Sequence, residues 1–133
     1  MITSQPLRWA TVWHAVGAAM VLFITVMSLS PSSSPILVFS VWDKLLHFIG
    51  YAGVGAWYVM VVSQTHHIRL WIALVCLGIA LELLQGFVPG RATEGLDAVA
   101  NTLGATAGTA LGLTPWRNLL RKIEHVCRPE SRR

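Results

Sequence analysis

The chain has 133 residues, of which 54% are hydrophobic and only 12% are charged, and its mean hydropathy is +0.59. This composition is too apolar for a soluble domain of that length. The formal net charge of +4 does not indicate nucleic-acid binding, because no basic patch is interleaved with aromatic residues. The composition therefore predicts a membrane protein with no nucleic-acid partner.

Four long apolar stretches follow one another along the chain. A membrane-spanning helix needs about 20 mostly apolar residues, and the stretches cover approximately residues 9–29, 44–63, 69–88 and 96–113. Strands are not expected, because an open sheet edge cannot satisfy its hydrogen bonds in lipid. We therefore predict an all-α polytopic membrane protein, with four transmembrane helices in a single domain over residues 1–133.

Two further segments are predicted to lie along the membrane surfaces. Ile36–Trp42 is apolar but too short to span, and it would lie at the outer interface or tuck back between helices. Residues 115–133 place apolar side chains at helical spacing among basic ones, which predicts an amphipathic helix on the anionic cytoplasmic leaflet.

A ridge of small residues marks the fourth predicted helix. Gly104, Gly108 and Gly112 recur every four residues, a spacing that lets another helix approach closely. The partner of this ridge would be another helix of the chain, a second copy in a homo-oligomer, or another membrane protein.

The basic residues are distributed asymmetrically between the two ends of the predicted helices. Of the ten lysines and arginines, eight fall on the side of the termini and the second loop, and only Lys44 and Arg91 fall on the other. Loops rich in Lys and Arg stay in the cytoplasm. This bias predicts that both termini, and the turn at His66 and His67, are cytoplasmic.

Polar residues interrupt the outer halves of the last three predicted helices. His47 and Tyr51 follow Asp43 at four and eight residues, which places all three on one helical face. Glu82 lies two turns, roughly 9 Å, below the outer end of its helix. An ionisable group in a membrane segment is costly without a partner and marks a working site by default. The predicted outward-facing pocket contains Asp43, Lys44, His47, Tyr51, Glu82, Gln85, Arg91, Asp97 and Asn101.

Three of these residues are candidates for catalysis. His47 would be a general base or acid, because His titrates closest to neutral pH, and Asp43 would orient it. Glu82 would be a second acid–base group. A metal site would use His47 with Asp43, Glu82 or Asp97, but one histidine is few for zinc. The sequence therefore predicts no metal and no cofactor.

The other members of the set are candidates for binding. Arg91, with Lys44 at the mouth of the pocket, would grip an anionic group through two parallel hydrogen bonds. An alternative stays open: Arg91 pairs with Asp97 or Glu82 in an internal network that only ties helices together. The remaining binding candidates are Tyr51, Gln85, Asp97 and Asn101.

The polar segments resemble a known family. DKLLHFIGYAG at residues 43–53 and ELLQGFVPGRATEGLDAVANTLGATAG at residues 82–108 are similar to the VanZ-like family of small bacterial membrane proteins. The resemblance implies a multi-pass protein of the bacterial cytoplasmic (inner) membrane with a cell-envelope role. It also suggests a link to resistance to teicoplanin, the property from which the family takes its name. It does not imply a reaction.

Three functions are compatible with these residues. The first is a site that binds, or acts on, an anionic envelope lipid or lipid-linked precursor from the outer face. The second is a non-catalytic scaffold or shielding module for envelope components. The third is a small proton-coupled exporter, although the small multidrug transporters carry their essential Glu in helix one, where this chain has no carboxylate.

Overall fold

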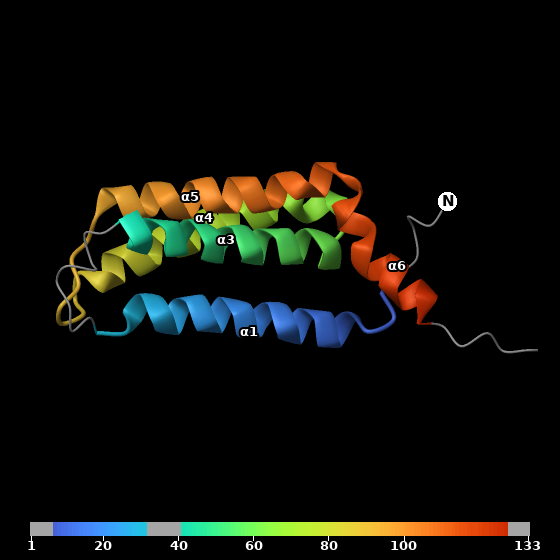
Figure 1. Cartoon of the computed structure of the whole chain (residues 1–133), viewed down its shortest axis with the longest axis horizontal. Coiled ribbons are helices and arrows are strands. Elements are labelled where there is room, and N and C mark those ends of the chain that lie inside the picture. The colour runs from blue at the N-terminus through green and yellow to red at the C-terminus, as the bar shows by residue number, and fades with distance from the viewer. Residues whose placement is uncertain (1–6, 32–40, 128–133) are drawn as a thin grey trace, which may run out of the picture.

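The computed structural model describes residues 7–31 and 41–127, and all regular structure within these ranges is helical (Figure 1). The long helices are α1 (Ala10–Leu29), α3 (Val41–Val61), α4 (His67–Gln85) and α5 (Gly95–Ala110). Short 3-10 turns lie at Gln64–His66, Leu111–Leu113 and Pro115–Asn118, and a final helix is α6 (Leu119–Val126). The all-α class is therefore confirmed for the described part of the chain.

The predicted interfacial segment falls mainly outside the described ranges. Of Ile36–Trp42, only Val41 and Trp42 are described, and they form the start of α3. The end of the predicted amphipathic tail, residues 128–133, also lies outside them.

The helices end earlier than the apolar pattern predicts. α4 stops at Gln85, and the next backbone bonds, such as Val88 N–H to the Gln85 carbonyl, belong to a turn. Gly90 then adopts a φ of 77°, a left-handed conformation that favours glycine. α5 stops at Ala110 because its last turn tightens into the 3-10 turn that follows.

α3 and α5 form the most extensive helix pair of the bundle, and they run side by side in Figure 1. A Cβ atom at Gly104 would overlap with the backbone carbonyl of Phe48, and one at Gly108 with the carbonyl of Ala52. The predicted small-residue ridge therefore packs against α3 within one chain. Self-association of the protein stays a prediction.

Two apolar clusters form the core. Tyr51 and Val54 of α3 pack with Leu74 of α4 and Ala105 of α5. The second cluster joins the chain before α1, the end of α3 and α6, and consists of Leu7, Met60, Val61 and Leu120. The core thus sits between α3, α4 and α5, and a smaller cluster connects α6 to the N-terminal segment.

Large apolar side chains cover the outside of the bundle. Leu22 and Phe23 of α1 are 64% and 65% exposed, and Leu83 of α4 is 61% exposed. Contiguous exposed apolar surface of this kind is rare on soluble monomers and marks an interface with protein or lipid. The outward faces of these helices therefore suit a hydrocarbon environment.

Two helical segments of the described chain are long and apolar enough to cross a membrane, namely Ala10–Leu29 and Gln64–Gln85. Few of their residues are buried, unlike those of a soluble core helix. α5 has 16 residues, about 24 Å of helix, which is shorter than the hydrocarbon core of about 30 Å. α3, which carries Asp43 and Lys44 near its start, is not among these two segments either. Spans by α3 and α5 stay predictions.

The N-terminal segment is fastened to α6 by one carboxylate. Glu124 accepts hydrogen bonds from the backbone N–H groups of Arg8 (2.7 Å) and Trp9 (3.0 Å) and from the indole N–H of Trp13 (2.7 Å). Glu124 thus satisfies the two backbone N–H groups that immediately precede α1, from a helix more than 110 residues later in the chain. We call these three bonds the Glu124 clasp.

Candidate functional site

The predicted site residues meet at one end of the bundle, where α3 and α5 begin and α1 and α4 end (Figure 1). Four of them are among the most buried polar side chains of the described chain, each 2–3% exposed: Glu82, Gln85, Asp97 and Asn101. Glu94, the residue just before α5, joins them. We call the following group the polar cluster: Asp43, Lys44, His47, Tyr51, Glu82, Gln85, Arg91, Glu94, Asp97 and Asn101.

Lys44 connects α3 to the start of α5. Its Nζ lies 2.6 Å from Glu94 Oε2 and 3.1 Å from Asp97 Oδ1. Glu94 is the cluster member that sequence reasoning did not place in the site. Negative charge is favourable at a helix N-terminus, so the position of Glu94 gave no reason to expect an ion-pair partner for its side chain.

His47 is held in a defined orientation. Its Nδ1 lies 2.9 Å from the Asn101 side-chain oxygen, and because an amide oxygen accepts, we assign the ring proton to Nδ1. In a neutral ring Nε2 is then unprotonated, and it lies 3.7 Å from Asp43 Oδ2. That separation is too long for a hydrogen bond. In the neutral tautomer, the lone pair of Nε2 is therefore directed toward the Asp43 carboxylate.

Glu82 caps α5 from inside the bundle. One carboxylate oxygen accepts the backbone N–H of Glu94, the N-cap residue of α5. The other oxygen, Oε2, is buried and has no hydrogen-bond partner in residues 7–31 and 41–127. Electrostatic interactions link Glu82 with Asp97 and His47. Glu82 therefore lies near Asp97 and His47, and its role in a shared pocket with Asn101 stays a prediction.

Arg91 and Gln85 hold the C-terminal end of α1. Arg91 donates from Nε to the Ser30 carbonyl and from Nη2 to the Met27 carbonyl, both at 3.1 Å. Gln85 Nε2 donates to the Ser28 carbonyl at 2.9 Å. These bonds satisfy carbonyl groups that a helix end leaves without partners.

The position of Arg91 bears on its predicted role. Besides the two carbonyl bonds, its Nη1 lies 3.6 Å from Asp43 Oδ1. Arg91 thus connects helices through Asp43 and carbonyl groups, whereas the alternative named Asp97 or Glu82 as its partner. That Arg91 has only a structural role stays a prediction. The grip on an anionic group stays a prediction.

Tyr51 lies one turn deeper than His47. It is 1% exposed, and its hydroxyl is among the buried polar atoms without a hydrogen-bond partner in the described chain. Tyr51 and Asn101 approach α4 at Gly78, where an added Cβ would lie 3.4 Å from Tyr51 Cε1 and 2.9 Å from Asn101 Cβ. Tyr51 and Asn101 therefore pack side by side against α4 at Gly78.

The cluster carries more acidic than basic groups. Asp43, Glu82, Glu94 and Asp97 contribute four carboxyl groups against Lys44 and Arg91. Ligand atoms of Asp43, His47 and Asp97 all lie within 4.8 Å of one another, a spacing that could hold a metal ion. From the sequence, His47 with Asp43, Glu82 or Asp97 was a possible metal site, but a single histidine was too few to predict zinc.

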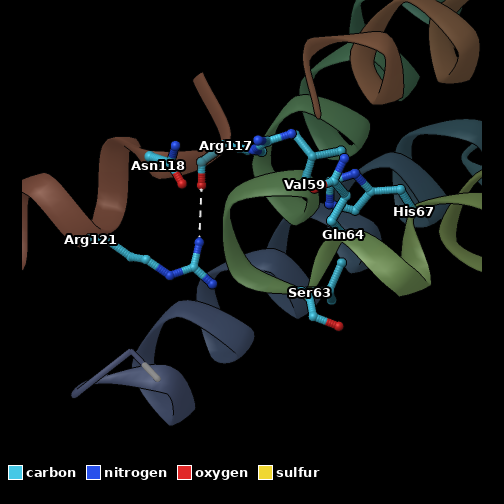
Figure 2. A pocket seen from close by; sticks show the side chains of 8 residues that line it. Val59, Ser63, Gln64, His67, Arg117, Asn118 and Arg121 are labelled. Atoms are coloured by element: carbon cyan, nitrogen blue, oxygen red, sulfur yellow. Dashed lines mark hydrogen bonds between the residues drawn. The ribbon is translucent and has the colours of Figure 1, made fainter. Parts of the chain in front are cut away.

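A cavity of about 100 Å³ lies at the opposite end of the bundle, where α3 ends and α4 begins (Figure 2). Arg121 donates to the Arg117 carbonyl beside it, at 3.4 Å. Sequence reasoning did not predict this cavity, and the predicted pocket at the polar cluster stays a prediction. The lining residues are Val59, Val62, Ser63, Gln64, His67, Arg117, Asn118 and Arg121.

An all-helical bundle with apolar outer faces and a buried polar cluster at one end defines a small helical membrane protein. The chain matches the family model described as VanZ/LLP1 over residues 3–116. It belongs to that family, which confirms the resemblance seen in the sequence. The match covers α1, α3, α4 and α5 and ends before α6. Comparisons with curated proteins and with solved structures found no match.

Proposed function

We propose that the polar cluster binds, and acts on, an anionic cell-envelope lipid or lipid-linked precursor at the outer face of the bacterial inner membrane. The observation that carries the proposal is the oriented imidazole of His47, with Nδ1 bound to Asn101 and Nε2 directed at Asp43. Membership in the VanZ/LLP1 family supports an envelope role and, with it, a link to teicoplanin resistance.

The proposal includes a topology. We place α1, α3, α4 and α5 across the membrane, with both termini in the cytoplasm, because basic residues gather at the end that holds α6. The polar cluster then lies at the outer ends of the helices. An amphiphile in the outer leaflet would reach it with the head group, while its chains stay against the apolar helix faces.

His47 would handle the proton in any reaction at this site. Nε2 would take a proton from an attacking water or hydroxyl group and return it to the leaving oxygen. Asp43 would stabilise the imidazolium that forms in between, and Asn101 would keep the ring in the required tautomer. Glu82 would serve as the second acid–base group, through the oxygen that has no hydrogen-bond partner in the described residues.

The charge balance sets a condition on the ligand. Lys44 and Arg91 already contact carboxylates of the cluster. An anionic head group would therefore have to displace Glu94, Asp97 or Asp43 from these cations, or arrive with additional positive charge. Exchange of ion-pair partners is less costly at Lys44, whose side chain is 24% exposed, than at a fully buried pair.

Co-purified lipids test this function. We would extract the protein with its bound lipids and identify them by mass spectrometry, for wild type, His47→Gln and Lys44→Gln, which removes the more exposed cation of the cluster. An anionic lipid or lipid-linked precursor should be enriched on wild type and depleted on both variants. His66→Gln is the matched control, because this exposed histidine lies at the other end of the bundle. Equal lipid profiles on all four proteins would overturn the proposal.

A non-catalytic scaffold is the second candidate, and the bonds from Arg91 and Gln85 to the end of α1 favour it. In that case the cluster mainly fixes how the helices pack. Glu82→Gln separates the two functions, because an amide keeps the shape and the acceptor oxygen but cannot exchange a proton at neutral pH. A scaffold should tolerate this change in a teicoplanin-susceptibility assay, whereas an acid–base site should not.

A further inference from the structure

We propose that Asp43, His47 and Asp97 bind a divalent transition-metal ion, Zn²⁺ or Mn²⁺, at the polar cluster. These three side chains would ligate the ion, and its binding does not rest on the proposed function. Its use, to supply the positive charge that an anionic head group needs there, rests on the proposed function.

The spacing of the three side chains fits such an ion. Zn²⁺ lies about 2.1 Å from His nitrogen and carboxylate oxygen, so two ligands of one ion lie up to about 4.2 Å apart. His47 Nε2 and Asp43 Oδ2 are 3.7 Å apart. All three ligand atoms lie within 4.8 Å of one another. To bind one ion, even the most widely separated pair would therefore have to move closer by only about 0.6 Å.

His47 has the orientation of a metal ligand. A ligating histidine almost always donates its other ring N–H to a carboxylate, a carbonyl or water, which fixes the tautomer. Here Nδ1 donates to the Asn101 side-chain oxygen at 2.9 Å. The lone pair of Nε2 is left directed toward Asp43. Asn101, itself 2% exposed, is therefore a positioning residue of the proposed site.

Buried carboxylate oxygens provide independent support. Glu82 is 3% exposed, and its Oε2 has no hydrogen bond in the described ranges. Glu94 Oε1 is in the same situation. Such oxygens are expensive to bury without a cation or a donor. Asp97 is 2% exposed, and the Lys44 ammonium group already lies beside its Oδ1. A divalent ion on Asp97 would reduce the excess of negative charge around all three carboxylates.

Lys44 currently supplies part of that positive charge. Its Nζ is 3.1 Å from Asp97 Oδ1 and 2.6 Å from Glu94 Oε2. A metal ion on Asp97 would compete with the ammonium group, which would keep Glu94 as its partner. Removal of the ammonium group should therefore leave metal affinity unchanged or increase it.

The donor set selects the kind of ion. Imidazole nitrogen suits zinc and iron-group metals, whereas carboxylate oxygens suit magnesium, calcium and manganese. One nitrogen with two carboxylates favours Zn²⁺ or Mn²⁺ over Ca²⁺. Three protein ligands also leave coordination positions for water or a phosphate oxygen, as in catalytic rather than structural zinc sites.

Calorimetric titration of the purified full chain with Zn²⁺ or Mn²⁺ tests the site, after removal of metals with a chelator and without a histidine tag. Wild type should bind one ion per chain, and its melting temperature should rise with the ion. Asp97→Asn and His47→Gln should bind at least tenfold more weakly, and Asn101→Leu about 10–100-fold more weakly. His66→Gln is the control that should bind as wild type does.

Two results would overturn the proposed metal site. In the first, neither ion changes the melting temperature of the wild-type protein or produces heat in the titration. In the second, His47→Gln binds the ion as tightly as wild type does. Lys44→Met keeps the test decisive if a ligand variant fails to fold, because it must bind the ion at least as tightly as wild type. Metal binding with no lipid on the protein would refute only the proposed function. Bound lipid with no metal would refute only this inference.

Discussion

At the residue scale, the side chains of the polar cluster each join two or more elements of the bundle. Lys44 joins α3 to α5. Arg91 joins the loop before α5 to the C-terminal end of α1 and to the start of α3. Glu82 joins α4 to α5. The same residues that are candidates for binding therefore also carry stability, so variants must be measured for both properties.

Arg91 should contribute more to stability than its place in a loop suggests. We expect Arg91→Ala to lose about 1.5–3 kcal/mol of unfolding free energy, the range for hydrogen bonds to charged groups. Arg91→Lys should lose most of the same amount, because an ammonium group cannot reproduce the planar donors that reach Ser30 and Met27. Denaturation in detergent measures both, with exposed Arg69→Ala as the control. Wild-type stability in both variants, combined with lost lipid binding, would instead assign Arg91 to the ligand.

At the element scale, the close approach of α3 and α5 depends on glycines. We expect Gly108→Ala to destabilise the bundle by about 1–3 kcal/mol, because the new methyl group meets the carbonyl of Ala52, which cannot move alone. Gly95→Ala is the matched control in the same helix, since no atom lies within 4 Å of its added Cβ. Thermal melts should place Gly108→Ala well below Gly95→Ala. Equal melting temperatures would mean that the two helices separate easily.

The Glu124 clasp should make the contact between the N-terminal segment and α6 sensitive to acid. Burial alone would raise the pKa of Glu124, but hydrogen bonds from Trp13, Trp9 and Arg8 and the charge of Arg8 outweigh it and lower the pKa. A carboxyl group with a lowered folded-state pKa stabilises the fold above its unfolded pKa of about 4.3. That stability is lost as the pH falls through the folded-state pKa.

Tryptophan fluorescence can follow this loss. Trp13 should change its emission in wild type below about pH 4.3, whereas Glu124→Gln should lack that transition because its side chain does not titrate. The same acid transition in both proteins would exclude the clasp as its source. Far-UV circular dichroism recorded in parallel would separate release of the clasp from general unfolding.

At the scale of the whole molecule, the sequence predicted the helical class and the end of the bundle where polar residues gather. The i, i+4 spacing of Asp43 and His47 was enough to predict that their side chains share one helical face, because helical periodicity fixes which side chains lie together. The partners of Arg91 could not be predicted, since backbone carbonyls carry no sequence signal. Glu124 was equally hidden, because a carboxylate in an amphipathic helix is normally solvated. Contacts over 111–116 residues of separation leave no local pattern.

The two cysteines offer a test of the proposed topology. Both are exposed in the structure, with Cys127 just after α6 and Cys76 in the middle of α4. A membrane-impermeant maleimide should label neither in intact cells and only Cys127 after permeabilisation, because Cys76 would face lipid. Cys127→Ser should then abolish labelling. Labelling of Cys127 from outside would place the polar cluster on the cytoplasmic side and reverse the proposal.

The Glu124 clasp also orders events during biosynthesis. The ribosome makes residues 8–13 early, while their acceptor on α6 is made more than 110 residues later. Until then the N–H groups of Arg8 and Trp9 must be satisfied by water or lipid head groups at the interface. The long helices can therefore form and pack in chain order, and the N-terminal segment is bound last. A chain that stalls before residue 124 would leave the N-terminal segment without this acceptor, although Gln85, Arg91 and the indole of Trp57 would still bind α1.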